Sequence, residues 1–342
     1  MKHPIRLPTP FDIIHRRVYT INRCFYCGKR LRSDRSREHV FPEWLQNKFA
    51  LANQTITLLN GTTIPYRSLK VPCCKACNNV HLSQLENQMK ALLFARPIED
   101  LRQHLDLVFI WITKILLAII YAERLLPLRR RYPQGKRILA RELWDSFQMT
   151  HFFIQSLIVP MQFTTCDDDE PRIPGSVFVF DLNTANTPEQ QLYDFRDDVC
   201  TLSIFIRLGS RGIIAVADGG AIDMEIGDVV RRDADRKLHP IQFCEIGARI
   251  FYKATLFNRT PKYTLMKHDE SEDINVMQMP LAGLSPLPVF NQWQHPAYAE
   301  VLSAFTGYPI EIIAPGDRTR VMQWLADENG KPLDLPCGPG GQ

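Results

Sequence analysis

The chain has 342 residues, of which 45% are hydrophobic and 23% charged, and its formal net charge is +4. This length allows about two domains of roughly 150 residues each, and the composition excludes a largely disordered chain. The charge is unevenly distributed. Residues 1–96 hold 16 Lys and Arg against 5 Asp and Glu, whereas residues 143–342 hold 16 against 27. The basic N-terminal part, residues 1–96, is therefore predicted to bind a polyanion, unlike the acidic C-terminal part.

Neither a signal peptide nor a membrane span is expected. Residues 1–14 contain three prolines and no apolar core, which predicts a cytoplasmic protein. The segment Leu107–Ala122 is apolar at 14 of 16 positions. It is shorter than the roughly 20 residues that a bilayer requires, and it carries Lys114 near its centre. We therefore expect a buried helix and no membrane partner.

The first 96 residues predict a cysteine knuckle, a hairpin and a helix. Thr55–Leu59 and Thr62–Tyr66 flank Asn60-Gly61, which is the favoured two-residue hairpin turn. After Cys77, apolar residues recur with helical spacing at positions 82, 85, 89, 92 and 93, and the pattern ends before Pro97.

The rest of the chain predicts a helical region followed by a mixed one. Helices are expected over residues 98–163, including Ile138–Gln155, and Thr164–Ser176 has the acids, Pro and Gly of a linker. Short β-branched and aromatic runs then predict strands at Val177–Leu182, Cys200–Leu208, Gly212–Ala217, Gln242–Phe257 and Ile310–Ile313. Helices are expected near Pro296–Phe305 and Arg318–Asp327.

The expected fold class is α+β, in three consecutive parts. Residues 1–96 form a zinc-stapled domain and residues 97–163 a helical connecting region. Residues 164–342 form a mixed α/β domain with antiparallel strands.

Two Cys-x-x-Cys pairs predict a structural zinc site. Cys24 and Cys27 form the first pair, and Cys74 and Cys77 form the second. Four thiolates from two tight turns satisfy a closed tetrahedral Zn²⁺ site. Cys73 competes with Cys74 as a ligand, but only Cys74 has the two-residue spacing to Cys77.

The residues between and after the two pairs carry a family resemblance. Glu38-His39 is followed by Val-Phe-Pro, and Asn78 directly follows the second pair at the start of the predicted helix. This combination resembles the HNH endonuclease family, whose fold is the ββα-metal fold, and it covers about residues 21–95. A lone Glu-His pair would be weak support for this resemblance, whereas the combined motif is specific to the family.

The resemblance implies roles for individual residues. His39 is implied as the general base, and Glu38 and Asn78 as the ligands of a catalytic Mg²⁺ or Mn²⁺ ion. His81 is a further candidate ligand, with capping or packing as the alternative. The middle Asn of the family's motif has no clean counterpart, and Asn53 and Asn60 are the two candidates.

Basic residues surround this motif, and they predict a nucleic-acid partner. The candidates for phosphate contacts are Arg30, Arg32, Arg35 and Arg37, and the alternative is a solvated charged face. Aromatic residues that could stack on single-stranded bases are sparse among them, so DNA is favoured over RNA.

The resulting hypothesis is a metal-dependent endonuclease that hydrolyses phosphodiester bonds in DNA. The acidic C-terminal part is expected to regulate or target it through a protein partner, a ligand or self-association. A role in anti-phage defence or a mobile element is an analogy with free-standing HNH proteins. Two alternatives remain: a non-catalytic zinc-containing nucleic-acid-binding protein, and an RNA-cleaving nuclease.

Overall fold

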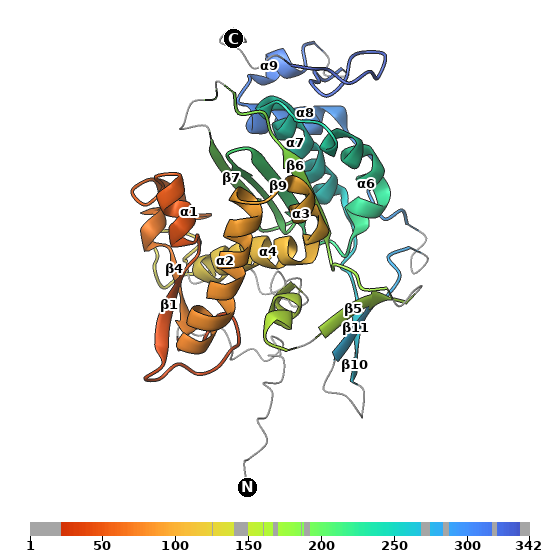
Figure 1. Ribbon diagram of the computed structural model, residues 1–342. Coiled ribbons are helices and arrows are strands. Elements are labelled where there is room, and N and C mark those ends of the chain that lie inside the picture. The colour runs from red at the N-terminus through yellow and green to blue at the C-terminus, as the bar shows by residue number, and fades with distance from the viewer. Residues whose placement is uncertain are drawn as a thin grey trace. The chain divides into compact units, whose positions relative to one another are not determined.

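The computed structural model describes residues 22–124, 126–139, 150–159, 161–166, 170–185, 187, 192–267, 274–282, 287–316 and 320–335. The fold is α+β with antiparallel sheets, as the sequence predicts (Figure 1). The chain forms two compact units, each assembled from three separate segments. Unit 1 comprises residues 1–95, 106–174 and 262–279, and unit 2 comprises residues 96–105, 175–261 and 280–342. These units therefore differ from the three consecutive parts expected from the sequence.

The described strands of unit 1 form two antiparallel pairs and a three-stranded sheet. β1 (Arg35–His39) pairs with β4 (Lys70–Cys74), so that Arg35 lies opposite Cys74 and His39 opposite Lys70. β2 (Thr55–Thr57) pairs with β3 (Thr63–Pro65). The three-stranded sheet has the order β10 (Tyr263–Lys267), β11 (Ile274–Gln278), β5 (Met161–Thr165), and β11 is parallel to β5. The expected linker Thr164–Ser176 therefore begins within β5.

The hairpin is where the sequence places it, but its turn is one residue longer. Leu58 N donates to Thr62 O at 2.8 Å, and Gly61 N donates to Leu58 O at 2.8 Å. Gly61 has a φ of +76°, in the left-handed region that glycine adopts without steric cost. The turn is thus the three-residue type, in which a tight turn is followed by a left-handed residue.

The helical elements of unit 1 include the one predicted after Cys77. They are α1 (Glu43–Lys48), η1 (Tyr66–Ser68), η2 (Cys77–Leu82), α2 (Ser83–Phe94), α4 (Leu105–Glu123, whose first residue belongs to unit 2) and η3 (Gln155–Leu157). Residues 150–154 are also helical, and residues 140–149 of the expected helix Ile138–Gln155 lie outside the described residues. In α2 the predicted stripe is buried at Leu85, Met89 and Leu93.

α4 is the long apolar helix that the sequence predicts. Among the described helices it alone is long and apolar enough to cross a bilayer, and 78% of its apolar window is buried inside the protein. Its Trp111 stacks on Trp44 of α1 at 6.1 Å between ring centroids. The helix therefore contributes to the core of unit 1, as expected.

Unit 2 is an antiparallel sheet covered by helices. The strand order is β6 (Ser176–Asp181), β9 (Arg211–Val216), β8 (Ser203–Leu208), β7 (Tyr193–Asp198). The described helices are α3 (Ile98–Gln103), α6 (Ala221–Ala234), α7 (Pro240–Leu256), α8 (His295–Thr306) and α9 (Ile310–Ile313). Figure 1 shows α6, α7 and α8 beside this sheet, and Phe243 of α7 stacks on Phe205 of β8 at 4.3 Å.

Three sequence predictions in unit 2 are wrong. Gln242–Phe257 is not a strand: all of it except Phe257 lies in helix α7, because Pro240 and a capping box between His239 and Gln242 start a helix there. Ile310–Ile313 is also helical. The described residues 320–327 are not helical, because the backbone N–H groups of Trp324 and Leu325 donate to the Glu245 carboxylate and not to a preceding turn.

Candidate functional site

The first Cys-x-x-Cys pair forms a tight turn attached to β4. Cys24 N donates to Lys29 O at 2.9 Å, and Gly28 N donates to Cys24 O at 3.0 Å. Gly28 has a φ of +69°, which explains why glycine follows the second cysteine. Phe25 N donates to Pro72 O at 2.9 Å, and this bond holds the turn beside the second cysteine pair.

The four predicted zinc ligands come together. One ligand atom from each of Cys24, Cys27, Cys74 and Cys77 lies within 4.8 Å of the other three. Zinc–sulfur bonds of about 2.3 Å place the sulfurs of a tetrahedral site about 3.8 Å apart. The Sγ atoms of Cys27 and Cys74 are 3.8 Å apart, so the cluster has the dimensions that a metal ion such as zinc requires.

Cys73 is also close to this cluster. Its buried Sγ lies 3.7 Å from Cys24 Sγ, so a fifth thiol borders the four that can hold the metal. Hydrogen bonds among the thiols lower the pKa of Cys24 and raise the pKa values of Cys27 and Cys77, so the thiols are coupled to one another. The group of four mutually close sulfurs contains Cys74 and not Cys73, in agreement with the predicted spacing.

Buried contacts fix the cysteine turn to the core of unit 1. Tyr26 is fully buried and donates its hydroxyl to Ile154 O. His151 is also fully buried, and its Nε2 lies 2.6 Å from Tyr26 O. Phe25 packs edge-on against Tyr121 of α4. A metal centre at this position would therefore join β4, α4 and the helical residues 150–154.

Alternation along β1 places the motif residues on two faces of the strand. Successive side chains of a strand point to opposite faces. Arg35, Arg37 and His39 therefore share one face, and Ser36 and Glu38 share the other. The exposure of these residues agrees, since Arg35 and Arg37 are exposed and Glu38 is buried. Glu38 and His39 are adjacent in sequence but belong to different surroundings.

His39 is partly accessible and favours the neutral state. Its side chain is 17% exposed, and its Nδ1 lies 3.4 Å from Glu43 Oε1, one turn away at the start of α1. Burial lowers the pKa of His39, and Lys70 lowers it further, against the opposing effect of Glu43. A neutral imidazole can accept a proton at cellular pH.

Glu38 lies in a buried ionic triad. Lys114 Nζ, from the middle of α4, is 2.8 Å from Glu38 Oε1 and 2.8 Å from Glu86 Oε1 of α2. Lys114 is fully buried and Glu38 is 6% exposed. Burial raises the pKa of Glu38 to about 7, although the neighbouring ammonium opposes the rise. The carboxylate implied as a metal ligand is thus already paired with an internal cation.

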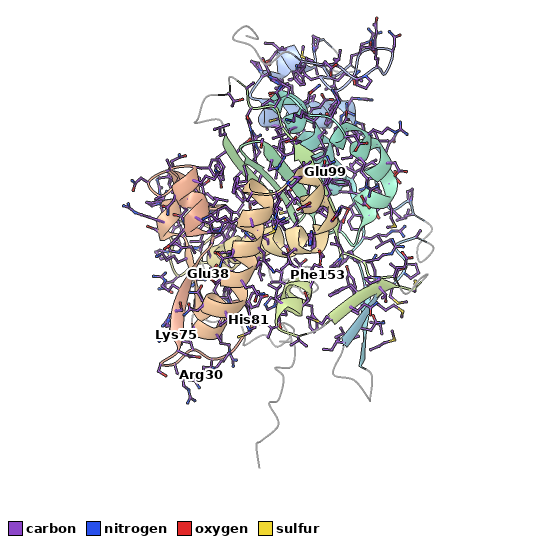
Figure 2. The ribbon with its side chains drawn as sticks, viewed as in Figure 1. Arg30, Glu38, Lys75, His81, Glu99 and Phe153 are labelled. Atoms are coloured by element: carbon purple, nitrogen blue, oxygen red, sulfur yellow. The ribbon has the colours of Figure 1, made fainter. Side chains whose placement is uncertain are left out.

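Asn78 contacts β1 through Ser36, which lies on the face of the strand opposite His39. Asn78 is half-buried, and its Nδ2 donates to Ser36 Oγ at 2.6 Å. It lies in η2, a π-helical turn, whose i→i+5 hydrogen bonds make it wider than an α-helical turn. His81, which Figure 2 labels, lies in the same turn and is also half-buried.

The described residues bring together no second group of three or more His, Cys, Asp and Glu side chains of the kind that holds a metal. Neither Asn53 nor Asn60 is shown beside His39. Asn53 accepts a hydrogen bond from Arg67, while Asn60 donates to Pro127 O and accepts from Thr62 N within the hairpin turn. Of the ligands that the resemblance implies for a catalytic cation, Glu38 is paired with Lys114, and Asn78 binds Ser36 through its Nδ2.

The predicted phosphate contacts are all exposed side chains, and they are Arg30, Arg32, Arg35 and Arg37. Lys75 is a further exposed cation near these arginines. Its backbone N–H donates to Asp34 O, and this bond holds it beside the cysteine turn. Figure 2 shows Arg30 and Lys75 at one end of the β1–β4 pair and Glu38 farther along it. A basic surface thus follows β1 from the cysteines toward His39.

Sequence reasoning missed four residues at the site, namely Ser36, Glu43, Glu86 and Lys114. The sequence carries a signal for one of them. Lys114 is the single charge in an apolar stretch of 16 residues, and a buried lysine requires a carboxylate partner. The identity of that partner depends on the packing of α2 and β1 against α4, which the sequence pattern does not specify.

Comparisons with family models, with curated proteins and with solved structures find no match to this chain.

Proposed function

We propose that this protein is an HNH-type endonuclease that hydrolyses phosphodiester bonds in DNA. The observation that carries the proposal is the placement of His39. This imidazole favours its neutral form and lies on the same face of β1 as Arg35 and Arg37. A proton acceptor beside phosphate-binding cations is what hydrolysis of a phosphodiester requires.

His39 would act as the general base. When its Nδ1–H donates to Glu43, the lone pair is on Nε2, which can then take a proton from the attacking water. Glu43 is a positioning residue in this proposal, because it orients the imidazole without contacting the substrate. Arg35 and Arg37 would hold the phosphate backbone across the same face.

A structural Zn²⁺ ion fits the four cysteines and would stabilise the fold of unit 1 around β1 and β4. The proposed Mg²⁺ or Mn²⁺ ion lacks such a fit, since Lys114 holds Glu38 and the described residues form no second cluster of metal-binding side chains. Its participation is proposed from the family resemblance alone.

We further propose that residues 143–342, with their net charge of −11, regulate or target the nuclease. A strongly acidic segment is a poor non-specific binder of DNA. Its contribution would therefore come through a partner, a ligand or self-association.

The decisive experiment is a plasmid-nicking assay with the full chain, in Mg²⁺, in Mn²⁺ and in EDTA. We expect His39→Ala to lower the rate about 10²–10⁴-fold, which is the usual contribution of a general base. The matched control is His104→Ala, because His104 is an exposed histidine of unit 2. Zinc content and DNA affinity should stay close to those of the wild type in both variants.

Wild-type cleavage by the His39→Ala variant would contradict the proposed mechanism. DNA binding without cleavage in any metal would favour the non-catalytic binding protein instead. Preferential cleavage of a single-stranded RNA of matched sequence would favour the RNA-cleaving alternative.

A further inference from the structure

Unit 2 contains a cavity of about 740 Å³ between α6 and α7. Its other borders are the start of α8, Trp293 and the segment 320–328. Sites for small molecules in proteins commonly have volumes of about 300–1,000 Å³. The cavity therefore has the size of a ligand site, and it lies within one unit.

One wall of the cavity is apolar and follows from helical spacing. Ile226, Val229 and Val230 lie on one face of α6, and Ile246 lines the cavity from α7. Val229 is 53% exposed, and Met322, on the opposite side, is 41% exposed. Exposed apolar side chains that border one cavity are typical of a binding site.

A buried carboxylate holds the opposite wall in place. Glu245, which is fully buried on α7, accepts hydrogen bonds from Trp324 N at 2.6 Å and Leu325 N at 3.1 Å. Its other oxygen accepts a hydrogen bond from Arg249 Nη2 at 2.5 Å. Met322 N donates to Ile313 O at 2.8 Å. These bonds hold the segment 320–328 against α7 and α9.

Aromatic rings line the end of the cavity near α8. Trp293 and Tyr298 both border it, with their ring centroids 4.9 Å apart. Trp293 also packs edge-on against Tyr252 at 4.6 Å. Because its neighbours fix the indole ring, it offers a rigid apolar surface to a ligand.

Cations predominate among the charged residues of the lining. Arg249, Lys253 and Arg320 line the cavity, against the acids Asp233 and Glu328, and Lys253 Nζ is paired with Glu225 at 3.1 Å. Asp233 is already paired with Arg236, whose Nη2 is 2.8 Å away. A guanidinium has five N–H donors, so Arg249 can hold Glu245 with one group and donate to a ligand with another.

We propose that this cavity binds a small organic anion, with an apolar, aromatic-sized body and one acidic group. The body lies between the apolar face of α6 and Trp293, and the acidic group binds Arg249 and Arg320. This assignment rests on unit 2 alone and is independent of the proposed nuclease activity.

The test uses two fluorescent probes that differ in one charged group. 1-Anilinonaphthalene-8-sulfonate carries a sulfonate, and N-phenyl-1-naphthylamine has the same ring system without it. The folded full chain is titrated with each probe. We expect one saturable site for the sulfonate probe and an increase in melting temperature on binding, since a ligand of the native state stabilises that state.

Arg249→Gln and Arg320→Gln should each weaken binding of the sulfonate probe about tenfold, because each removes a charge-assisted hydrogen bond. Neither variant should change binding of the neutral probe. Arg249→Gln removes the Arg249–Glu245 pair and could prevent folding. Arg320 is exposed, so Arg320→Gln tests the role of the acidic group without that risk. Val229→Trp fills the cavity and should abolish binding of both probes, whereas Met224→Trp, on the same helix but outside the cavity, should not.

The proposal is overturned if the sulfonate probe shows no saturable site. It is also overturned if Val229→Trp binds both probes as the wild type does, or if both probes respond equally to Arg320→Gln.

Discussion

Lys114 shows how one residue can link the core of unit 1 to the candidate site. It lies within the most apolar helix of the described chain, is fully buried, and contacts carboxylates from a strand and from a second helix. Such a group is costly to bury unless it is paired. The triad therefore fixes Glu38, and with it the end of β1 that carries His39.

We expect Lys114→Met to destabilise the protein by about 3–5 kcal/mol, because it leaves the buried Glu38 and the half-buried Glu86 without a cation. Thermal unfolding followed by circular dichroism measures the effect. The triple variant Lys114→Met, Glu38→Gln, Glu86→Gln should recover most of the stability, since no buried charge remains. A single Lys114→Met variant as stable as the wild type would show that the triad does not form.

The pH dependence of cleavage tests His39. The base must be neutral, so activity is lost as the pH falls through its pKa. Burial and Lys70 lower that pKa, with a smaller opposing effect from Glu43 and Glu86, so the midpoint of the acidic limb should lie below the ordinary value of 6.5. Glu43→Gln removes one of the opposing charges and should move the midpoint lower still. The pH profile of kcat/KM measures the midpoint in the wild type and in Glu43→Gln. An upward shift of the midpoint in Glu43→Gln would contradict the assignment of His39 as the base.

At the scale of elements, the two cysteine turns depend on each other, because each supplies half of the metal cluster. Cys74→Ser should remove bound zinc and partly unfold unit 1, since a structural zinc site contributes folding energy. Cys73→Ala is the matched control, and it should retain one zinc per chain. Elemental analysis measures the zinc content of both variants and shows which of the two cysteines is the fourth ligand. Loss of zinc in Cys73→Ala with retention in Cys74→Ser would assign the fourth ligand to Cys73 instead.

The sequence predicted the elements whose signals are local. The hairpin follows from Asn60-Gly61 between β-rich runs, and the cysteine cluster follows from spacing alone. The strand prediction for Gln242–Phe257 is wrong because the aromatic and β-branched residues of this segment suggest a strand, whereas Pro240 and the His239–Gln242 capping box start a helix. The pairing of Glu38 with Lys114 joins residues 76 positions apart, and no local pattern encodes it.

For the whole molecule, the charge asymmetry predicts that exposed acids of unit 2 weaken DNA cleavage. Neutralising two of them, Asp228→Asn with Glu311→Gln, should raise the cleavage rate of the full chain about twofold at low salt, because each exposed charge contributes only a few tenths of a kcal/mol. The effect should fade at high salt. The charge-conserving pair Asp228→Glu with Glu311→Asp is the control. An unchanged rate in the neutralised variant would argue against electrostatic restraint.

The parallel pairing of β5 with β11 has a consequence during synthesis of the chain. β5 ends at Thr165, and its partner begins at Ile274, so the ribosome must add about a hundred residues, most of unit 2, before the two strands can meet. At about 5–20 residues per second this takes on the order of ten seconds. Throughout that interval the cysteine knuckle and His39 have left the ribosome while the three-stranded sheet of their unit is still incomplete. The nascent chain therefore cannot complete unit 1 before most of the acidic part has been made.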